Sequence, residues 1–203
     1  MDSAQNKPGL EGAATGVPRC GWCSDDPVYQ HYHDTEWGVP EYDAQRLFEK
    51  LLLDGFQAGL SWITVLKKRE RYRQVYCGFD PHFMAQQSDE ALLALLEDPG
   101  IIRNRLKVKG ARQNAQAWLR VAEVTDPGEW LWSFVGGAPR INHFADLGEV
   151  PVMTEQAQAM SKALKQAGFT FVGPTICYAF MQATGMVMDH TRDCFRYAQL
   201  TRI

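Results

Sequence analysis

Long apolar runs, regular cysteine spacing and a basic excess are all missing from this chain of 203 residues. Residues 1–18 are small, polar and rich in glycine and alanine, so they predict a disordered tail rather than a signal peptide or a membrane helix. The five cysteines are irregularly spaced, which favours a reducing cytoplasm over a disulfide framework. Sustained period-two alternation, typical of strands, is also missing. We therefore expect a cytoplasmic, all-α protein with no membrane partner, whose helical domain occupies residues 19–203.

The formal net charge of -3 does not suggest a nucleic-acid partner, because proteins that bind phosphates usually carry a basic excess. The average hides a local bias. Two segments gather the basic residues Lys67, Lys68, Arg69, Arg71 and Arg73, and Arg103, Arg105, Lys107, Lys109 and Arg112. Each run alone is typical of a solvated helix face, whereas two runs flanking a turn favour a phosphate-binding surface.

Apolar residues at helical spacing, together with capping residues, predict helices over most of the chain. Asp43 and Ser88 are expected to be N-caps, and Pro174 suits a first helical turn. The expected helices span residues 43–53, 60–76, 88–97, 101–121, 129–135, 154–167, 174–184 and 189–200. Cys77 and Cys177 are expected to be buried thiols.

Four soft-metal ligands lie near the two ends of the chain: Cys20, His33, His190 and Cys194. Two thiolates and two imidazoles are typical of a closed structural zinc site, which would join the two terminal segments. His190 and Cys194 have i to i+4 spacing, so we expect them to project from the same face of one helix. A site with four protein ligands leaves no coordination position for chemistry.

Spacing alone leaves the ligand set open. Cys23 forms a C-x-x-C pair with Cys20, which is either a redox motif or an alternative half of the metal site. His31 is a further candidate ligand beside His33. Ordinary buried thiols and histidines also explain the same residues.

A turn at Asp98-Pro99-Gly100 separates two of the expected helices. A Pro-Gly turn on its own indicates only a turn. With basic residues after it, the segment is also typical of a helix-hairpin-helix, in which the amides of Gly100 and Ile102 would face a phosphate. Arg103, Arg105 and Lys107 would add ionic contacts to the DNA backbone without reading a base.

Aromatic residues are concentrated near the start of the domain, at Trp22, Tyr29, Tyr32 and Trp37, and Trp62 follows. Singly, each is typical of a core residue. Together they predict a slot for a planar, cationic guest, because electron-rich rings attract positive charge. Tyr32 and Asp54 would add hydrogen-bonding selectivity, although Asp54 also suits a solvated helix end.

Five blocks of sequence carry a family resemblance. They are Cys20-Gly-Trp22, Tyr32-His-Asp-Thr-Glu-Trp-Gly-Val-Pro40, Gln57-Ala-Gly-Leu-Ser-Trp-Ile-Thr-Val-Leu-Lys-Lys-Arg69, Gly100-Ile-Ile-Arg103 and Phe171-Val-Gly-Pro-Thr-Ile-Cys-Tyr178. In this order they closely resemble bacterial 3-methyladenine DNA glycosylase I. The resemblance covers the chain from about Arg19 to Cys194 and implies a helix-hairpin-helix glycosylase fold.

The resemblance also implies roles for individual residues. One structural zinc per chain would be held by Cys20, His33, His190 and Cys194, which leaves Cys23 and His31 outside the set. The base pocket and its catalytic groups would be Tyr32, Asp54 and Trp62, with Trp22 and Tyr29 as further substrate-binding residues. Gly59 and Leu60 match the loop that approaches the gap in the DNA. The family pocket commonly presents a glutamate where this chain has the shorter Asp54.

The implied function is base-excision repair: the enzyme flips N3-methyladenine out of double-stranded alkylated DNA and hydrolyses its glycosidic bond. The sequence does not fix the oligomeric state, and a monomer is the simpler expectation. The match designates no lysine as a Schiff-base nucleophile, so we expect no lyase activity. A non-catalytic damaged-DNA-binding protein of the same fold is the alternative. A zinc-stabilised interaction module is the third interpretation, and it requires the aromatic residues to be core.

Overall fold

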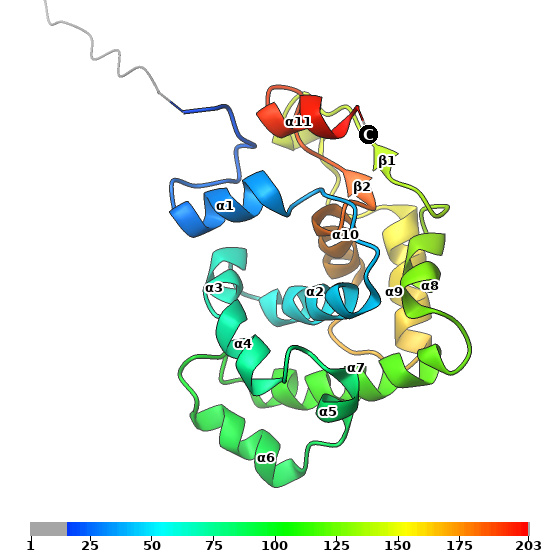
Figure 1. Ribbon diagram of the computed structural model, residues 1–203. Helices are drawn as coiled ribbons and strands as arrows, with labels where there is room; N and C mark the ends of the chain where they lie inside the picture. The colour runs from blue at the N-terminus through cyan, green and yellow to red at the C-terminus, as the bar shows by residue number, and fades with distance from the viewer. Residues whose placement is uncertain (1–15, 203) are drawn as a thin grey trace, which may run out of the picture.

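Residues 16–202 are described by the computed structural model, in which short helices pack around a central one (Figure 1). The first helices are α1 (Pro27–Thr35), α2 (Ala44–Gln57), α3 (Trp62–Leu66), α4 (Arg69–Val75), α5 (Pro81–Ala85), α6 (Asp89–Ala94) and the 3₁₀ turn η1 (Leu95–Glu97). Then come α7 (Arg105–Ala122), α8 (Pro127–Ser133), β1 (Arg140–Ile141), η2 (Leu147–Glu149), α9 (Glu155–Gln166), α10 (Pro174–Ala183), β2 (Val187–Met188) and α11 (Phe195–Leu200).

Side-chain caps set several of the helix starts. The carboxylate of Asp43 accepts a hydrogen bond from the amide of Arg46 at the start of α2, and the hydroxyl of Ser88 accepts one from Ala91 in α6. Each cap satisfies a backbone donor that the first turn leaves without a helical partner. Pro174 occupies the first turn of α10. The expected caps at Asp43 and Ser88 are therefore confirmed.

The core is built around α2. Its residues Leu47, Phe48, Leu51 and Leu52 are almost fully buried. α10 and α7 pack on this helix, and Figure 1 shows it between α1 and α7. The spacing of the buried residues, three or four apart, is that of a helix with one apolar face toward the core. A central α2 places the side chains of its last turns inside the molecule.

Two expected helices are shorter than the sequence pattern predicts. The helix expected over 60–76 is divided into α3 and α4, with a break at Lys67 and Lys68. The helix expected over 101–121 begins only at Arg105, because the side chain of Asn104 caps it by accepting from the amide of Lys107. Residues 101–104 therefore belong to the connection between η1 and α7.

The expected helix over 189–200 is wrong in its first half. Val187–Met188 pairs in parallel with Arg140–Ile141, and α11 begins only at Phe195. His190 and Cys194 thus lie in an extended and turning segment, not on one helical face. Strands of two residues are too short to show period-two alternation, which explains why the sequence did not reveal them.

Of the predictions for the two remaining cysteines, one is confirmed and one is wrong. Cys177 is buried, as expected, whereas Cys77 is exposed at a turn and has φ of 50°, so its prediction as a core thiol is wrong.

Of the tail expected at residues 1–18, residues 1–15 lie outside the described part, and the carbonyl of Pro18 accepts a hydrogen bond from the amide of Phe195. Within residues 16–202, none of the helices is long and apolar enough to span a membrane.

Candidate functional site

A cavity of about 180 Å³ lies where α1, α2, α3 and α10 meet. The structure brings together there all five aromatic residues that the sequence singled out, and Asp54 with them. Its lining comprises Trp22, Tyr29, Tyr32, Trp37, Lys50, Asp54, Gln57, Trp62, Leu147, Val150, Ala179, Gln182, Ala183 and Asp189. The cavity therefore combines aromatic walls with a few polar groups, as small-molecule sites usually do.

The aromatic walls come from two directions. α1 carries Tyr29 and Tyr32 three residues apart, so both rings lie on the same side of the helix. The ring of Tyr32 meets that of Trp62 with 5.3 Å between centroids, while Trp22 lies 5.2 Å from Tyr29 and 4.9 Å from Trp37. These tilted and edge-to-face contacts hold the rings in fixed orientations around the cavity.

An ion pair forms the polar end of the cavity. Lys50 and Asp54, one turn apart on α2, bring Nζ to 3.0 Å from Oδ1. The side chain of Asp54 is only 2% exposed and that of Lys50 14%. The ammonium also lies 3.5 Å from the centroid of the Trp62 ring. Lys50 was not singled out from the sequence, although its i to i+4 spacing from Asp54 was a signal for the pair.

Burial shapes the titration of these groups. It raises the pKa of Asp54 and lowers that of Lys50, while the attraction between the two charges opposes both changes. Burial also raises the pKa of the Tyr32 hydroxyl. Among the described residues, Asp54 Oδ2 and Trp62 Nε1 are buried without a hydrogen-bond partner. Two of the residues that line the cavity therefore carry an unpaired polar atom, an acceptor in Asp54 and a donor in Trp62.

The Gly59–Leu60 loop lies beside this cavity, between α2 and α3. Gly59 has φ of 77°, a conformation that glycine adopts without strain, and Leu60 is 42% exposed. Gln57 and Trp62, on either side of the loop, both line the cavity. An exposed leucine thus stands next to the cavity.

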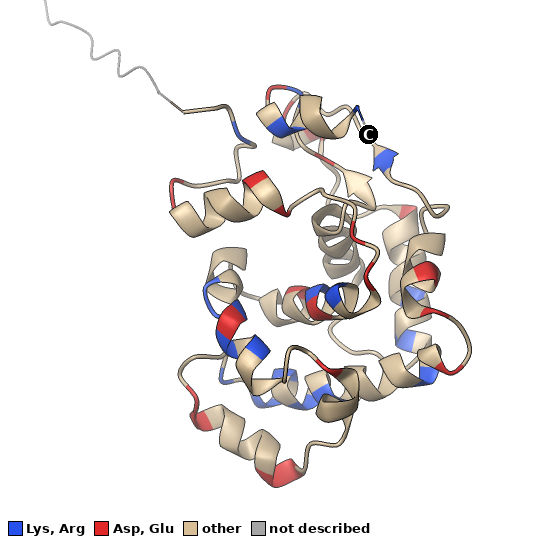
Figure 2. Ribbon diagram, in the orientation of Figure 1, with Lys and Arg blue, Asp and Glu red and all other residues tan. Residues whose placement is uncertain are grey.

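In the turn before α7, backbone amides that the sequence suggested for phosphate binding donate hydrogen bonds within the protein. Arg103 and Arg105 are exposed, and Figure 2 shows basic residues on α4 and along α7. The amide of Gly100 already donates to Asp98 Oδ1 at 2.7 Å, and that of Ile102 to the hydroxyl of Tyr72 at 3.0 Å. These two amides are therefore not free to bind a phosphate in this structure.

Lys107 also departs from its expected place. Its side chain is buried, and Nζ donates to the carbonyl oxygens of Phe56 at 2.7 Å and Ala58 at 2.8 Å. Two carbonyl acceptors offset the desolvation of the ammonium, although burial still lowers the pKa of Lys107. The expectation of a phosphate contact from Lys107 is corrected: this residue supports the end of α2 instead.

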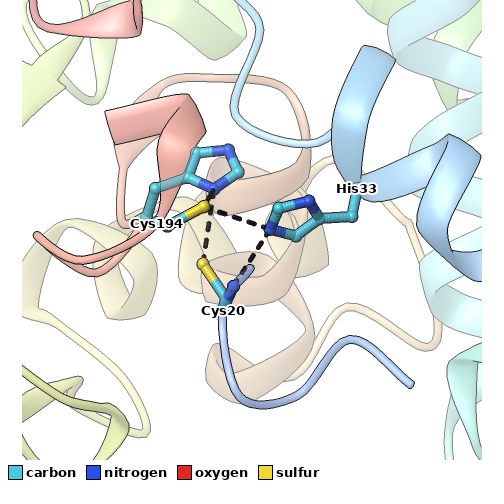
Figure 3. Close-up of side chains that lie close together, drawn as sticks. Cys20, His33 and Cys194 are labelled. Carbon is cyan, nitrogen blue, oxygen red and sulfur yellow. Dashed lines mark hydrogen bonds between the residues drawn. The ribbon is translucent and has the colours of Figure 1, made fainter. Parts of the chain in front are cut away.

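The four expected metal ligands meet in one buried cluster. The ligand atoms of Cys20, His33, His190 and Cys194 all lie within 4.8 Å of one another. Figure 3 shows the side chains of Cys20, His33 and Cys194 pointing toward one another. Cys194 Sγ is 3.4 Å from His33 Nε2 and 3.4 Å from His190 Nδ1. Of the open alternatives, Cys23 is only half-buried and His31 is exposed, and neither belongs to the cluster. This cluster could hold a metal ion.

Neighbouring groups orient the two imidazoles. Asp34 Oδ1, held by Arg19, lies 2.8 Å from His33 Nδ1, and the carbonyl of Trp37 lies 3.0 Å from His190 Nε2. The other nitrogen of each ring is thereby left for the centre of the cluster, as is usual for metal-binding histidines. A hydrogen bond from Cys20 lowers the pKa of the Cys194 thiol, while the same contact and burial raise the pKa of Cys20, so Cys194 is the thiolate of this pair.

The sequence profile of the methyladenine glycosylase family matches residues 22–197. The chain belongs to the methyladenine glycosylase family. It is 51% identical to DNA-3-methyladenine glycosylase 1 of Escherichia coli (strain K12) over 89% of this chain and 97% of that protein. A DNA-3-methyladenine glycosylase of Haemophilus influenzae is 48% identical over 87% of this chain and 96% of its own length.

Solved structures of the family share the fold. A crystal structure of 3-methyladenine DNA glycosylase I superposes with a TM-score of 0.86 at 51% identity, covering 88% of this chain and 98% of the other. The Staphylococcus aureus enzyme, whose structure addresses 3-methyladenine recognition, gives 0.86 at 35% identity, covering 88% and 96%. The predicted family membership is therefore confirmed.

Several lining residues of this family member were not found from its sequence. Asp189 accepts hydrogen bonds from Asn142 and Gln182, and it lines the cavity with Gln57. Leu147 in η2 and Val150 directly after it close another side. These residues come from segments far apart in the chain, so no local pattern marked them. The only sequence signal near Asp189 was the next residue, the candidate metal ligand His190.

Proposed function

We propose that this chain is a base-excision-repair glycosylase that flips 3-methyladenine out of alkylated double-stranded DNA and hydrolyses its glycosidic bond. One observation carries the proposal: a member of the methyladenine glycosylase family has an aromatic cavity whose lining residues Asp54 and Trp62 each carry a buried polar atom, Oδ2 and Nε1, without a hydrogen-bond partner. Its relatives named above are DNA-3-methyladenine glycosylases.

Recognition follows from the chemistry of the methylated base. Methylation at N3 makes the adenine of the nucleotide cationic, and the electron-rich faces of Tyr32, Trp22 and Trp62 attract a cation. The edge of adenine carries an amino donor beside ring-nitrogen acceptors. Because a buried unpaired group costs about 1–3 kcal/mol, a base that pairs with Asp54 Oδ2 recovers this cost. The shorter reach of Asp54 also allows a water-bridged contact.

Base flipping requires groups outside the cavity. Extrusion costs a few kcal/mol, and less for a damaged nucleotide. Leu60, exposed beside the cavity, would fill the vacated stack, and Gly59 lets its loop approach the DNA. Arg103 and Arg105 would hold the backbone from the helix-hairpin-helix around the turn.

The chemical step needs little acid assistance. As the bond between C1′ and N9 breaks, its electron pair moves into the cationic purine, which leaves neutral. The oxygen of water bonds to C1′ and loses its proton to solvent. The carboxylate of Asp54 would stabilise the positive charge that develops on the sugar. Lys50 is engaged by Asp54 and Trp62, so we expect water rather than an amine to attack, without lyase activity.

The terminal segments complete the proposal. We assign one structural zinc to Cys20, His33, His190 and Cys194, because two sulfur and two nitrogen donors suit its tetrahedral coordination. When bound, the ion would stabilise the fold and join the segment before α1, and α1 itself through His33, to the segment before α11, with no part in the reaction. The glycosylase unit would be residues 19–203, acting as a monomer in the cytoplasm.

Incubation with methylated duplex DNA, followed by chromatography of the released bases, tests the function. We expect release of 3-methyladenine, and its loss in Trp62→Ala with at least a tenfold weaker affinity for the free base. Tyr42→Ala, which removes an aromatic ring exposed to 55% outside the cavity, is the control. Damaged-DNA binding without base release would instead favour the non-catalytic alternative.

A further inference from the structure

Lys50 lies between the base cavity and a second, wider cavity. It lines both, and the second has a volume of about 460 Å³ and is bordered by Glu36 and Glu49. Those two carboxylates are already paired: Arg69 contacts Glu36 at 2.5 Å, and Arg73 contacts Glu49 at 2.8 Å. The carboxylate left for Lys50 is that of Asp54.

Three groups fix the Lys50 ammonium at this position. Nζ lies 3.0 Å from Asp54 Oδ1, 3.5 Å from the centroid of the Trp62 ring and 5.1 Å from that of Tyr32. The two ring faces replace part of the hydration that the ammonium loses on burial. The cation is therefore held by residues that also form the base pocket.

Asp54 depends on this cation. An ionised carboxylate that is only 2% exposed is unfavourable unless a charge or hydrogen bonds compensate it. Lys50 supplies the compensation and occupies Oδ1, so Oδ2 is the oxygen left to accept from a guest. We propose that Lys50 is a positioning residue of the base pocket, which keeps Asp54 ionised and directs its free oxygen to the base. The inference rests on the proposed function of the pocket.

Other charged and titratable groups also surround the pair. They are Tyr32 from α1, Glu36 directly after α1, Glu49 from α2, Arg69 and Arg73 from α4, and Asp189 after β2. The glutamates pair with the arginines, and Asp189 accepts from Asn142 and Gln182. Within residues 16–202, Lys50 is the only cationic side chain in contact with Asp54.

Titration of the Asp54 carboxyl, followed by ¹³C NMR in the free protein, tests the inference without relying on activity. Asp54→Asn identifies the signal. Lys50→Met removes the charge and keeps the approximate length of the side chain. The pKa of Asp54 should therefore rise, and the proton affinity of its carboxylate should increase at least tenfold. Lys50→Arg should restore most of the wild-type value. An unchanged Asp54 pKa in folded Lys50→Met overturns the role of Lys50.

The pH profile of excision gives the second readout. Because the carboxylate is the useful form, activity rises with pH as Asp54 ionises, and Lys50→Met should move this rise to higher pH. At a pH below the Asp54 pKa of both proteins, a tenfold higher proton affinity lowers kcat/KM about tenfold. Lys162→Met, an exposed lysine on α9, should keep the wild-type profile. Active Lys50→Met with the wild-type profile contradicts the inference alone, whereas wild-type protein without excision contradicts the proposed function.

Discussion

The ammonium of Lys107 donates a hydrogen bond of 2.7 Å to the carbonyl oxygen of Phe56. A second bond of 2.8 Å reaches Ala58. The start of α7 is thereby attached to the end of α2, directly before the Gly59–Leu60 loop. A basic residue that the sequence places in a DNA-binding run thus supports the loop from inside the protein.

Replacing Lys107 should affect stability before it affects DNA binding. Lys107→Met leaves the carbonyls of Phe56 and Ala58 without their donor, and we expect a loss of about 1–3 kcal/mol in the free energy of unfolding. Urea denaturation measures it. The salt dependence of DNA binding by the folded variant should stay at its wild-type slope, and a lower slope would mean that Lys107 does contact phosphate.

Replacing Arg103 should affect DNA binding rather than stability. It is exposed at the turn before α7, so Arg103→Glu should weaken binding to any duplex sequence and reduce the salt slope by about 1 or more. Fluorescence anisotropy at several salt concentrations gives both values. Lys162→Glu makes the same charge change on α9 and is the control. Equal effects of the two variants would indicate a general charge effect and no specific contact at the turn.

Leu60 should matter for duplex DNA more than for stability. Leu60→Ala changes a side chain that is 42% exposed, so the free energy of unfolding should move by no more than about 0.5 kcal/mol. Excision from a duplex should fall about tenfold because the flipped state loses its wedge. The fall should be smaller for a base placed in a mismatch. Val124→Ala, at a side chain 86% exposed, controls for loss of surface apolar area.

The metal cluster predicts one zinc per chain in purified protein, measured by elemental analysis. Removal by a chelator should lower the Tm by about 5 °C or more, because an ion present at 100 times its Kd contributes about 2.7 kcal/mol. Cys194→Ser should lose the ion, whereas Cys23→Ser, outside the cluster, should keep it. Metal-free protein with an unchanged Tm would exclude a structural role.

Local sequence determined the parts of this protein that depend on neighbouring residues. The caps at Asp43 and Ser88 act within one turn of chain, and Pro174 starts α10, so patterns of three to five residues were sufficient. The sequence also identified the candidate metal ligands and the aromatic residues of the cavity, because their chemistry depends on the residue type alone. The helical spacing misled in the segment before Cys194, because residues 189–194 form a non-helical connection between a strand paired with a distant one and α11.

Only the tertiary structure decided which charged groups are buried and what they contact. Lys107 and Lys50 look like surface lysines in the sequence, yet one supports the carbonyls before the Leu60 loop and the other neutralises Asp54 on the face of Trp62. Burial and partner choice arise when segments far apart in the chain converge. The desolvation of a charge is then compensated by groups that no local pattern can identify.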